Sequence, residues 1–194
     1  MILSHKGSLL IMKKFLDELP HHNGNRALEV AAGDGRVTKD FLKDKYKVVD
    51  CFDQCPLSVE ELEKLRSRYQ EIDLVDQASM QNYIWSRQYS AIYLRWCIGY
   101  LNDLELIAFL KNAGAHLEST RSRSTRNSNP SCFIFVFDNI LEDLEIPEEY
   151  EGQYVRRKEK IEEIFGKAGL IIHKFTEKQE LHQDYRSVIM WALY

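Results

Sequence analysis

The chain has 194 residues, of which 44% are hydrophobic and 29% are charged, so it can bury the core of one domain, and we expect a single domain over residues 1–194. Its net charge of -4 does not favour nucleic acid as a partner, although it leaves room for a local basic patch. No stretch approaches the roughly 20 apolar residues of a membrane span, and no signal peptide is recognised. We therefore expect a protein of the cytoplasm or nucleus without a membrane partner.

The cysteines do not have the spacing of a metal site. We therefore expect no metal, and we expect the cysteines to be small buried hydrophobic residues in a reducing compartment. They are Cys51, Cys55, Cys97 and Cys132.

The first half of the chain alternates between predicted strands and helices. A capped helix begins at Ser8 and ends before Pro20, and its apolar side chains have the spacing of a helix that packs on a sheet. Strands are then expected at residues 26–30, 47–52, 72–75 and 89–96, with helices at 36–42 and 57–69. This alternation favours a parallel sheet with right-handed crossovers.

The second half continues the same pattern and ends differently. A helix is expected at 104–117, a strand at 132–137, a helix at 154–166, and an antiparallel pair of strands at 170–175 and 188–193. Residues 119–131 are rich in Ser, Arg and Asn, too polar to bury, and are expected to form a mobile loop. The fold class is therefore α/β, a doubly wound and mostly parallel sheet with an antiparallel C-terminal strand.

A glycine turn follows the first predicted strand. Gly33 and Gly35 allow positive φ and a close approach of a ligand, and the next helix offers unpaired N–H groups. Asp53 ends the second strand 18 positions beyond Gly35, close to the roughly 20-residue spacing at which an acid reaches ribose hydroxyls. The full three-glycine dinucleotide pattern is absent, so S-adenosylmethionine fits better than NAD. The alternative is an ordinary strand, turn and helix with a surface Asp.

Other polar and aromatic residues end later strands. Arg95 and Trp96 end the strand at 89–96, and Asp138 and Asn139 end the strand at 132–137. Ligands of open α/β sheets bind outside the carboxyl ends of the strands. Arg95 and Trp96 are therefore expected at the same crevice as the glycine turn, and the end of the later strand is a second candidate site.

These residues carry a family resemblance. The run Leu94-Arg95-Trp96-Cys97-Ile98-Gly99-Tyr100-Leu101-Asn102-Asp103, the glycine turn and Phe137-Asp138-Asn139 keep the order and approximate spacing of one family. The chain resembles the eukaryotic protein N-terminal methyltransferases, which methylate the α-amino group of proteins that begin Xaa-Pro-Lys. The resemblance implies a Rossmann-like class I methyltransferase fold, S-adenosylmethionine as cofactor, and a protein N-terminal peptide as substrate.

The resemblance also implies a set of cofactor-binding residues. Arg36 would hold the methionine carboxylate through a two-pronged pair, Asp53 would accept from the ribose hydroxyls, and Gln81 would meet the adenine edge. Without the resemblance, Arg36 would be expected in a surface ion pair worth under about 1 kcal/mol. The full set is Ala31, Gly33, Arg36, Asp53, Gln54, Met80, Gln81 and Arg95.

Two of these positions depart from the family pattern. Ala31 stands where the family has a glycine, and Arg95 stands where the family has a Gln that touches the cofactor. A positive charge at Arg95 lies close to the expected sulfonium and would weaken binding unless Arg95 turns toward a carboxylate. Asp34 and Glu29 are the expected partners.

The residues implied in catalysis and substrate binding are partly changed as well. Asn139 matches a family Asn, and Trp96 matches an aromatic wall for the first residues of the substrate, with a core tryptophan as the alternative. Glu151 falls where the family has an Asp, so the carboxylate is kept. Tyr100 replaces a family His, and a phenol with a pKa of about 10 is a poor base at neutral pH.

Three functions therefore stay open. The favoured one is a protein N-terminal methyltransferase of the Xaa-Pro-Lys type, divergent or N-terminally short, because family members have a further lid segment before this point. The others are a catalytically impaired binding subunit with a methyltransferase fold and a methyltransferase for another amine. The polar loop at 119–131 is absent from the family pattern. The sequence leaves the oligomeric state unknown.

Overall fold

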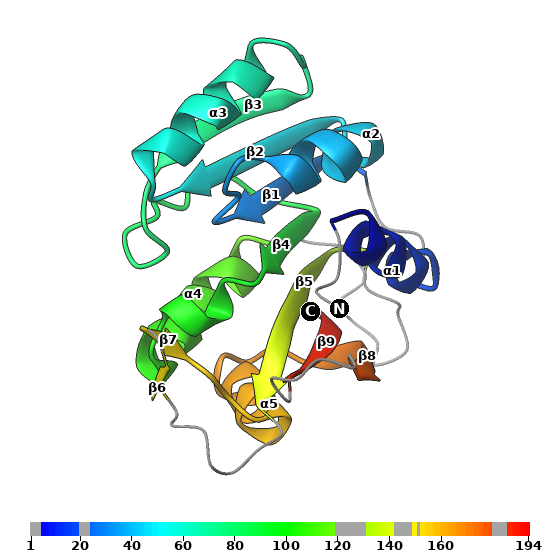
Figure 1. Ribbon diagram of the computed structural model, residues 1–194, viewed down its shortest axis with the longest axis vertical. Helices are drawn as coiled ribbons and strands as arrows, with labels where there is room; N and C mark the ends of the chain where they lie inside the picture. The colour runs from blue at the N-terminus through cyan, green and yellow to red at the C-terminus, as the bar shows by residue number, and fades with distance from the viewer. Residues whose placement is uncertain (1–4, 20–23, 119–130, 142–148, 151, 180–185) are drawn as a thin grey trace.

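The computed structural model describes residues 5–19, 24–118, 131–141, 149–150, 152–179 and 186–194 (Figure 1). The predicted polar loop falls almost entirely on residues 119–130, which lie outside the described residues, and so does Glu151.

One seven-stranded sheet organises the fold. Its strand order is β3-β2-β1-β4-β5-β9-β8, and the first five strands are parallel, whereas β9 runs antiparallel to both of its neighbours. The bounds are β1 Arg26–Val30, β2 Val48–Asp53, β3 Ile72–Gln77, β4 Ala91–Arg95, β5 Phe133–Leu141, β8 Ile172–Gln179 and β9 Arg186–Leu193. The predicted doubly wound α/β class is confirmed, and β4 is central as its apolar run indicated.

Helices cover both faces of this sheet. They are α1 His5–Asp17, the π-helical turn η1 Thr38–Leu42 continued by α2 Lys43–Lys45, α3 Pro56–Arg66, the 3-10 turn η2 Ile98–Tyr100, α4 Asp103–Ala115 and α5 Lys158–Lys167. A short hairpin of β6 Glu149–Tyr150 and β7 Gln153–Tyr154 lies beside α4 (Figure 1). Within the described ranges, no helix is both long enough and apolar enough to cross a membrane.

The core is divided between the two faces because alternate strand residues point to opposite sides. Leu28 and Val30 of β1 belong to the cluster under α4 and α5, whereas Ala27 belongs to the cluster under α1 and η1. A third, smaller cluster joins α3 to β2 and β3. This packing leaves the carboxyl ends of the parallel strands as one edge between the layers.

Local sequence explains where α4 begins. Asn102 is its N-cap: the side chain accepts from the backbone N–H of Glu105 at 3.0 Å, and the Glu105 carboxylate accepts from the backbone N–H of Asn102 at 2.9 Å. This reciprocal capping box fixes the end of the Trp96–Leu101 segment that precedes the helix.

Several predicted boundaries and environments are wrong. Ser8 is not a cap, because α1 begins at His5 and the Ser8 hydroxyl donates back to the His5 carbonyl at 2.8 Å. Tyr154 lies in β7 and not in a helix, since α5 begins at Lys158. Cys55 is exposed, unlike the other three cysteines, because it precedes α3 at the open edge of the sheet.

Candidate active site

The glycine turn after β1 has the backbone conformation that its sequence predicts. Gly33 and Gly35 have φ of 59° and 73°. A Cβ on Gly35 would lie 2.5 Å from Cδ1 of Leu65 and 2.7 Å from Cδ2 of Leu62 on α3, so a larger residue would have to displace these side chains as well as adopt a positive φ. Ala31 also has a positive φ, 49°, although it carries a Cβ. The turn is therefore packed against α3 on one side and strained at its first residue.

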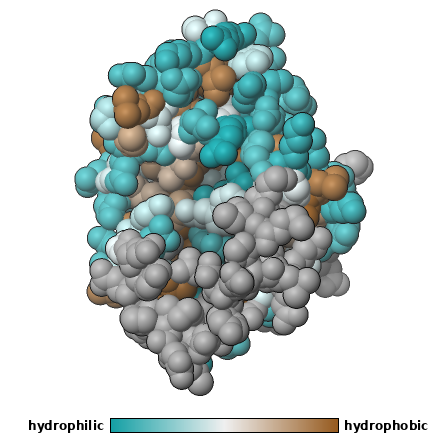
Figure 2. Space-filling model, in the orientation of Figure 1, coloured by the Kyte–Doolittle hydropathy of each residue, from teal (hydrophilic) through white to brown (hydrophobic). Residues whose placement is uncertain are grey.

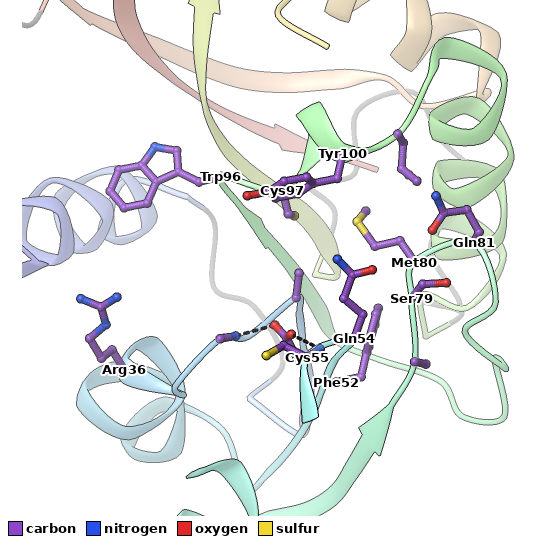
Figure 3. A pocket seen from close by; sticks show the side chains of 15 residues that line it. Arg36, Phe52, Gln54, Cys55, Ser79, Met80, Gln81, Trp96, Cys97 and Tyr100 are labelled. Carbon is purple, nitrogen blue, oxygen red and sulfur yellow. Dashed lines mark hydrogen bonds between the residues drawn. The ribbon is translucent and has the colours of Figure 1, made fainter. Parts of the chain in front are cut away.

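Asp53 fixes this turn to the end of β2. One carboxylate oxygen accepts from the backbone N–H of Gly33 and the other from that of Cys55, both at 2.8 Å (dashed lines in Figure 3). The residue is 8% exposed. Each carboxylate oxygen has a second lone pair, so the group can still accept from a ligand hydroxyl.

A cavity of about 490 Å³ opens between the glycine turn and the Trp96–Leu101 segment, a size within the range of about 300–1,000 Å³ for small-molecule sites. Figure 2 shows hydrophobic atoms at mid-height, surrounded by largely hydrophilic ones in the part of this face that is not grey. The lining residues are Ala31, Gly33, Arg36, Phe52, Asp53, Gln54, Cys55, Ala78, Ser79, Met80, Gln81, Trp96, Cys97, Tyr100 and Leu101.

The cavity brings together most of the residues that the sequence singled out. Seven of the eight expected cofactor residues line it, together with Trp96 and Tyr100. Arg95 is the exception and lines a smaller adjoining cavity of about 310 Å³, which shares Ala31, Gly33, Arg36 and Trp96 with the first. Asn139 lies at the same edge, near the end of β5, but does not line either cavity.

Arg36 lies at the start of the helical segment below the cavity, opposite Trp96 (Figure 3). Its Nε donates to Oδ1 of Asp34 at 2.8 Å, and both side chains are more than half exposed. The surface ion pair that was the alternative interpretation is therefore present. An exposed pair is worth under about 1 kcal/mol, so an incoming carboxylate can compete for this guanidinium.

Arg95 makes a different contact from the expected one. Among the described residues it forms no ion pair with Asp34 or Glu29; its Nη2 donates to Oγ of Ser8 at 2.6 Å, and its Cζ lies 4.0 Å from the centroid of the Trp96 ring. Burial lowers the pKa of Arg95 to about 10. Arg95 therefore stacks on Trp96, which has φ of 53° and is 36% exposed.

Glu29 is a buried acid that the sequence suggested only as a partner for Arg95. It is 5% exposed, lines the smaller cavity and accepts a hydrogen bond from the Thr38 hydroxyl. Burial raises its pKa to about 7. Glu29 therefore changes charge near neutral pH, beside the glycine turn.

Polar contacts also hold the far wall of the cavity. The Tyr100 hydroxyl accepts from Nε2 of Gln153 at 3.2 Å, and Oδ2 of Asp138 accepts from the backbone N–H of Ile98 at 3.1 Å. Burial raises the pKa of Asp138 to about 6. Asp138 therefore supports the segment that carries Tyr100 instead of lining the cavity.

The sequence reasoning missed several lining residues. Phe52 forms the floor, stacked on Tyr83 with ring centroids 4.1 Å apart, and Cys97 and Leu101 belong to the wall. Phe52 precedes Asp53, and Cys97 follows Trp96. Their position at the carboxyl end of a strand could have identified them as lining residues. No group of three or more His, Cys, Asp or Glu side chains that could hold a metal occurs in the part of the chain that the structure describes.

Comparison with known families gives one match over nearly the whole chain. A family model described as "AdoMet dependent proline di-methyltransferase" matches residues 4–194. The match includes the glycine turn, the cavity wall and β9, and so covers every part of the site described above.

Individual relatives agree with the family match. The chain is 28% identical over 185 residues to the alpha N-terminal protein methyltransferase 1 of Dictyostelium discoideum, covering 93% of this chain and 63% of the relative. It is 27% identical over 197 residues to the N-terminal Xaa-Pro-Lys N-methyltransferase 1 of Danio rerio, covering 96% and 80%. Against a relative from Oryza sativa it covers only 53% of that protein. The chain thus spans between about half and two thirds of the length of some of its curated relatives.

The fold has solved counterparts. A SAM-dependent methyltransferase from Leishmania major superposes with a TM-score of 0.81 at 24% identity, covering 98% of this chain and 72% of that one. An N-methyltransferase, NodS, from Bradyrhizobium japonicum superposes with a TM-score of 0.67 at 12% identity, covering 95% and 92%. At these identities the likeness shows the fold.

Proposed function

The chain belongs to the AdoMet dependent proline di-methyltransferase family, and from this premise we propose that it transfers a methyl group from S-adenosylmethionine to the α-amino group of a protein that begins Xaa-Pro-Lys. The strongest support for this proposal is the arrangement of the cavity. The glycine turn with its Asp53 anchor and the Trp96–Tyr100 wall face each other across one cavity (Figure 3). A cofactor and a peptide end can therefore meet there.

The cavity fits the cofactor in chemistry as well as in size. Asp53 offers free lone pairs to hydroxyls, Gln81 offers an amide to an adenine edge, and Phe52 and Met80 offer apolar contact. Arg36 offers a guanidinium that is more than half exposed and pairs with an exposed Asp34. When bound, S-adenosylmethionine would supply an electrophilic methyl group on a sulfonium.

The chain's own residues would align the amine and favour its neutral form. An α-amino group has a pKa of about 7.7–8.0, so a modest base is sufficient to remove its proton. Trp96, which is 36% exposed and has Arg95 stacked on its ring, would contact the proline ring through the part of its indole that Arg95 leaves free. Glu151 and Asn139 are proposed from the resemblance as the base and a substrate contact, and Tyr100 as a hydrogen-bonding group. Once the base has taken the proton, these residues would hold the neutral amine with its lone pair toward the methyl group that bound S-adenosylmethionine would supply.

Transfer to synthetic peptides tests this proposal. Labelled S-adenosylmethionine is incubated with the protein and an Xaa-Pro-Lys peptide, and the control is the same peptide acetylated at its N-terminus. Label is expected only in the free peptide, and Trp96→Ala is expected to reduce kcat/KM by about tenfold or more because the indole face is lost. Equal labelling of both peptides would contradict α-amino methylation.

A second function is favoured by one contact. Tyr100 stands where the resemblance places a His, and its hydroxyl accepts a hydrogen bond from Gln153. A phenol is a poor base at neutral pH, so Tyr100 does not replace the His as a base. A binding subunit without catalysis would bind S-adenosylhomocysteine and the peptide but transfer no label. Calorimetry on the same samples separates this outcome from the first. A methyltransferase for another amine would ignore the peptide as a competitor.

A further inference from the structure

Arg156 lies outside the cavity and connects three segments around it. It follows β7, is 6% exposed, and makes its contacts through all three guanidinium nitrogens. Nε donates to Oδ1 of Asp103 at 2.8 Å, and Nη2 donates to the carbonyl of Leu101 at 2.5 Å. Nη1 lies 3.2 Å from the carbonyl of Ile98 and 3.4 Å from that of Tyr154. One buried cation thus joins η2, α4 and the β6–β7 hairpin.

The carbonyls of Ile98 and Leu101 mark the two ends of the turn that carries Tyr100. Ile98 begins the turn and Leu101 follows it. Backbone carbonyls that are buried without a donor cost about 1–3 kcal/mol each. Arg156 therefore supplies a donor to the Leu101 carbonyl, and it gives the Ile98 carbonyl a second donor beside the long bond of 3.5 Å from the backbone N–H of Leu101.

The hairpin packs against the same turn at close range. A Cβ on Gly99 would lie 3.3 Å from the Tyr154 carbonyl and 3.6 Å from Cβ of Gln153. Gln153 donates to the Tyr100 hydroxyl from the same strand, β7. The orientation of Tyr100 therefore depends on where β7 lies, and Arg156 binds β7 and the turn together.

The glycine-turn side of the cavity has separate support. Asp53 accepts from the N–H groups of Gly33 and Cys55, which follow β1 and β2. Arg156 contacts none of these residues among the interactions described, since its partners are Asp103, Ile98, Leu101 and Tyr154. The two sides of the cavity are thus held by independent contacts.

We propose that Arg156 is a positioning residue for the peptide-binding side of the cavity: it fixes the Ile98–Leu101 turn and β7 as one unit, so that Trp96 and Tyr100 keep their places. The proposal rests on the proposed function for the identity of the substrate. It assigns no catalytic step to Arg156, because Arg156 does not line the cavity.

The test compares Arg156→Met with Arg157→Met. Arg157 is the exposed neighbour and serves as the matched control. Calorimetry measures S-adenosylhomocysteine binding first, and then the binding of an Xaa-Pro-Lys peptide to the protein loaded with S-adenosylhomocysteine. For Arg156→Met, peptide Kd is expected to rise by about tenfold or more while S-adenosylhomocysteine Kd stays within about twofold. Arg157→Met should match the parent in both, and Arg156→Lys should fall between them.

Hydrogen exchange gives a readout that needs no peptide. Exchange at the backbone N–H of Tyr100 and Leu101, bonded within the turn at 3.2 and 3.5 Å, is expected to accelerate by about tenfold or more in Arg156→Met. Exchange at Gly33 and Cys55 should not change. Gly99→Ala should accelerate the same turn amides with Arg156 intact, because the added Cβ pushes against the Tyr154 carbonyl.

The outcomes separate this inference from the proposed function. If the parent protein binds no peptide, the proposed function fails, and the exchange rates still decide whether Arg156 holds the turn. Turn amides that exchange at the parent's rate in Arg156→Met would overturn the inference. So would an equal loss of affinity for S-adenosylhomocysteine and peptide, or uniformly faster exchange, since either indicates a role in stability alone.

Discussion

The two ends of the parallel strands use charge in opposite ways. At the amino ends, Arg26 and Arg87 both pair with Asp50 and Asp73: Nη1 of Arg26 lies 2.8 Å from Oδ1 of Asp50, and Nη1 of Arg87 lies 2.5 Å from Oδ2 of Asp73. The hydrogen bond from Arg87 lowers the pKa of Asp73. Acid and base satisfy each other there, so these four side chains hold the strands together.

At the carboxyl ends the acids bind neutral groups instead. Asp53 and Asp138 accept from backbone N–H groups, and Glu29 accepts from a Thr38 hydroxyl; none of the three forms an ion pair with a described Lys or Arg. The cations at this end, Arg36 and Arg95, border the cavities; Arg36 pairs with Asp34 at the exposed surface, and Arg95 contacts Ser8 and Trp96. Buried ion pairs therefore hold the amino ends of the strands together, whereas at the carboxyl ends the cations are held by an exposed pair or by neutral groups, which a charged ligand can displace more easily.

The largest expected effect is at the amino end. Asp50 has a fully buried side chain, so Asp50→Asn should lower the free energy of unfolding by about 2 to 3 kcal/mol, less than for a fully buried pair because both guanidiniums partly contact water. Urea unfolding measures this, and Glu61→Gln, in an exposed pair with Lys64, is the control with no measurable change. The affinity for S-adenosylhomocysteine should not change. If the affinity for S-adenosylhomocysteine fell together with the free energy of unfolding, the amino and carboxyl ends of the strands would not act independently.

The next effect concerns pH. Burial raises the pKa of Glu29 from 4.5 to about 7, so the folded state binds the proton more tightly than the unfolded state. The stability that protonated Glu29 contributes is therefore complete below about pH 4.5 and is lost as the pH rises through about 7. Asp138, with its pKa raised to about 6, has the same sign.

Glu29→Gln tests this assignment, because a neutral amide imitates the protonated acid. The variant should be more stable than the parent by about 2–3 kcal/mol at pH 8 and about equally stable at pH 4.5. Urea unfolding at several pH values measures the difference. A difference that does not depend on pH would show that Glu29 does not titrate in this range.

A smaller effect is expected at Asp53, on binding. In Asp53→Asn the amide NH2 must face one of two backbone donors, Gly33 or Cys55, so the turn loses an acceptor. S-adenosylhomocysteine affinity should fall about tenfold, equal to ~1.4 kcal/mol. Calorimetry measures it. Asp34→Asn is the matched control: it releases Arg36 from its ion pair, so affinity should stay equal or rise, and a fall would argue against Arg36 as a carboxylate ligand.

The smallest effect concerns strain. Ala31 has φ of 49°, and an L-residue there costs about 1–2 kcal/mol, of which glycine's greater unfolded-state entropy offsets part. Ala31→Gly should therefore raise stability by about 0.5–1 kcal/mol, seen as a higher Tm. Gly33→Ala should act in the opposite direction, although its Cβ would meet no protein atom within 4 Å. Equal Tm values for both variants would show that the positive φ at these two positions does not affect stability.

The strands were predictable because apolar runs and turn residues are local signals. Residues 26–30 were expected as the first strand, and the structure has β1 at Arg26–Val30. Boundaries that depend on tertiary contacts were not predictable: Tyr154 has helix-compatible neighbours, yet it joins β7, where Arg156 and Gly99 hold it. Local propensity carries no information about such partners.

The site was predictable to the extent that it follows from strand ends. Gly33, Asp53 and Trp96 stand at carboxyl ends, so topology alone places them around one crevice. The partner of Arg95 was not predictable. Ser8 and the indole of Trp96 take its guanidinium in place of a carboxylate, and this choice depends on where α1 packs.

The placement of β9 between β5 and β8 has a consequence for the order of folding. Among the described strands β8 pairs with β9 alone, so the main-chain groups of β8 lack this partner until residues 186–193 have been synthesised. Trp191, fully buried against Phe165 of α5, is in the same last strand. A nascent chain can therefore assemble β1 to β5 on the ribosome, but α5 and β8 must wait, with an open edge exposed, for the final strand to emerge.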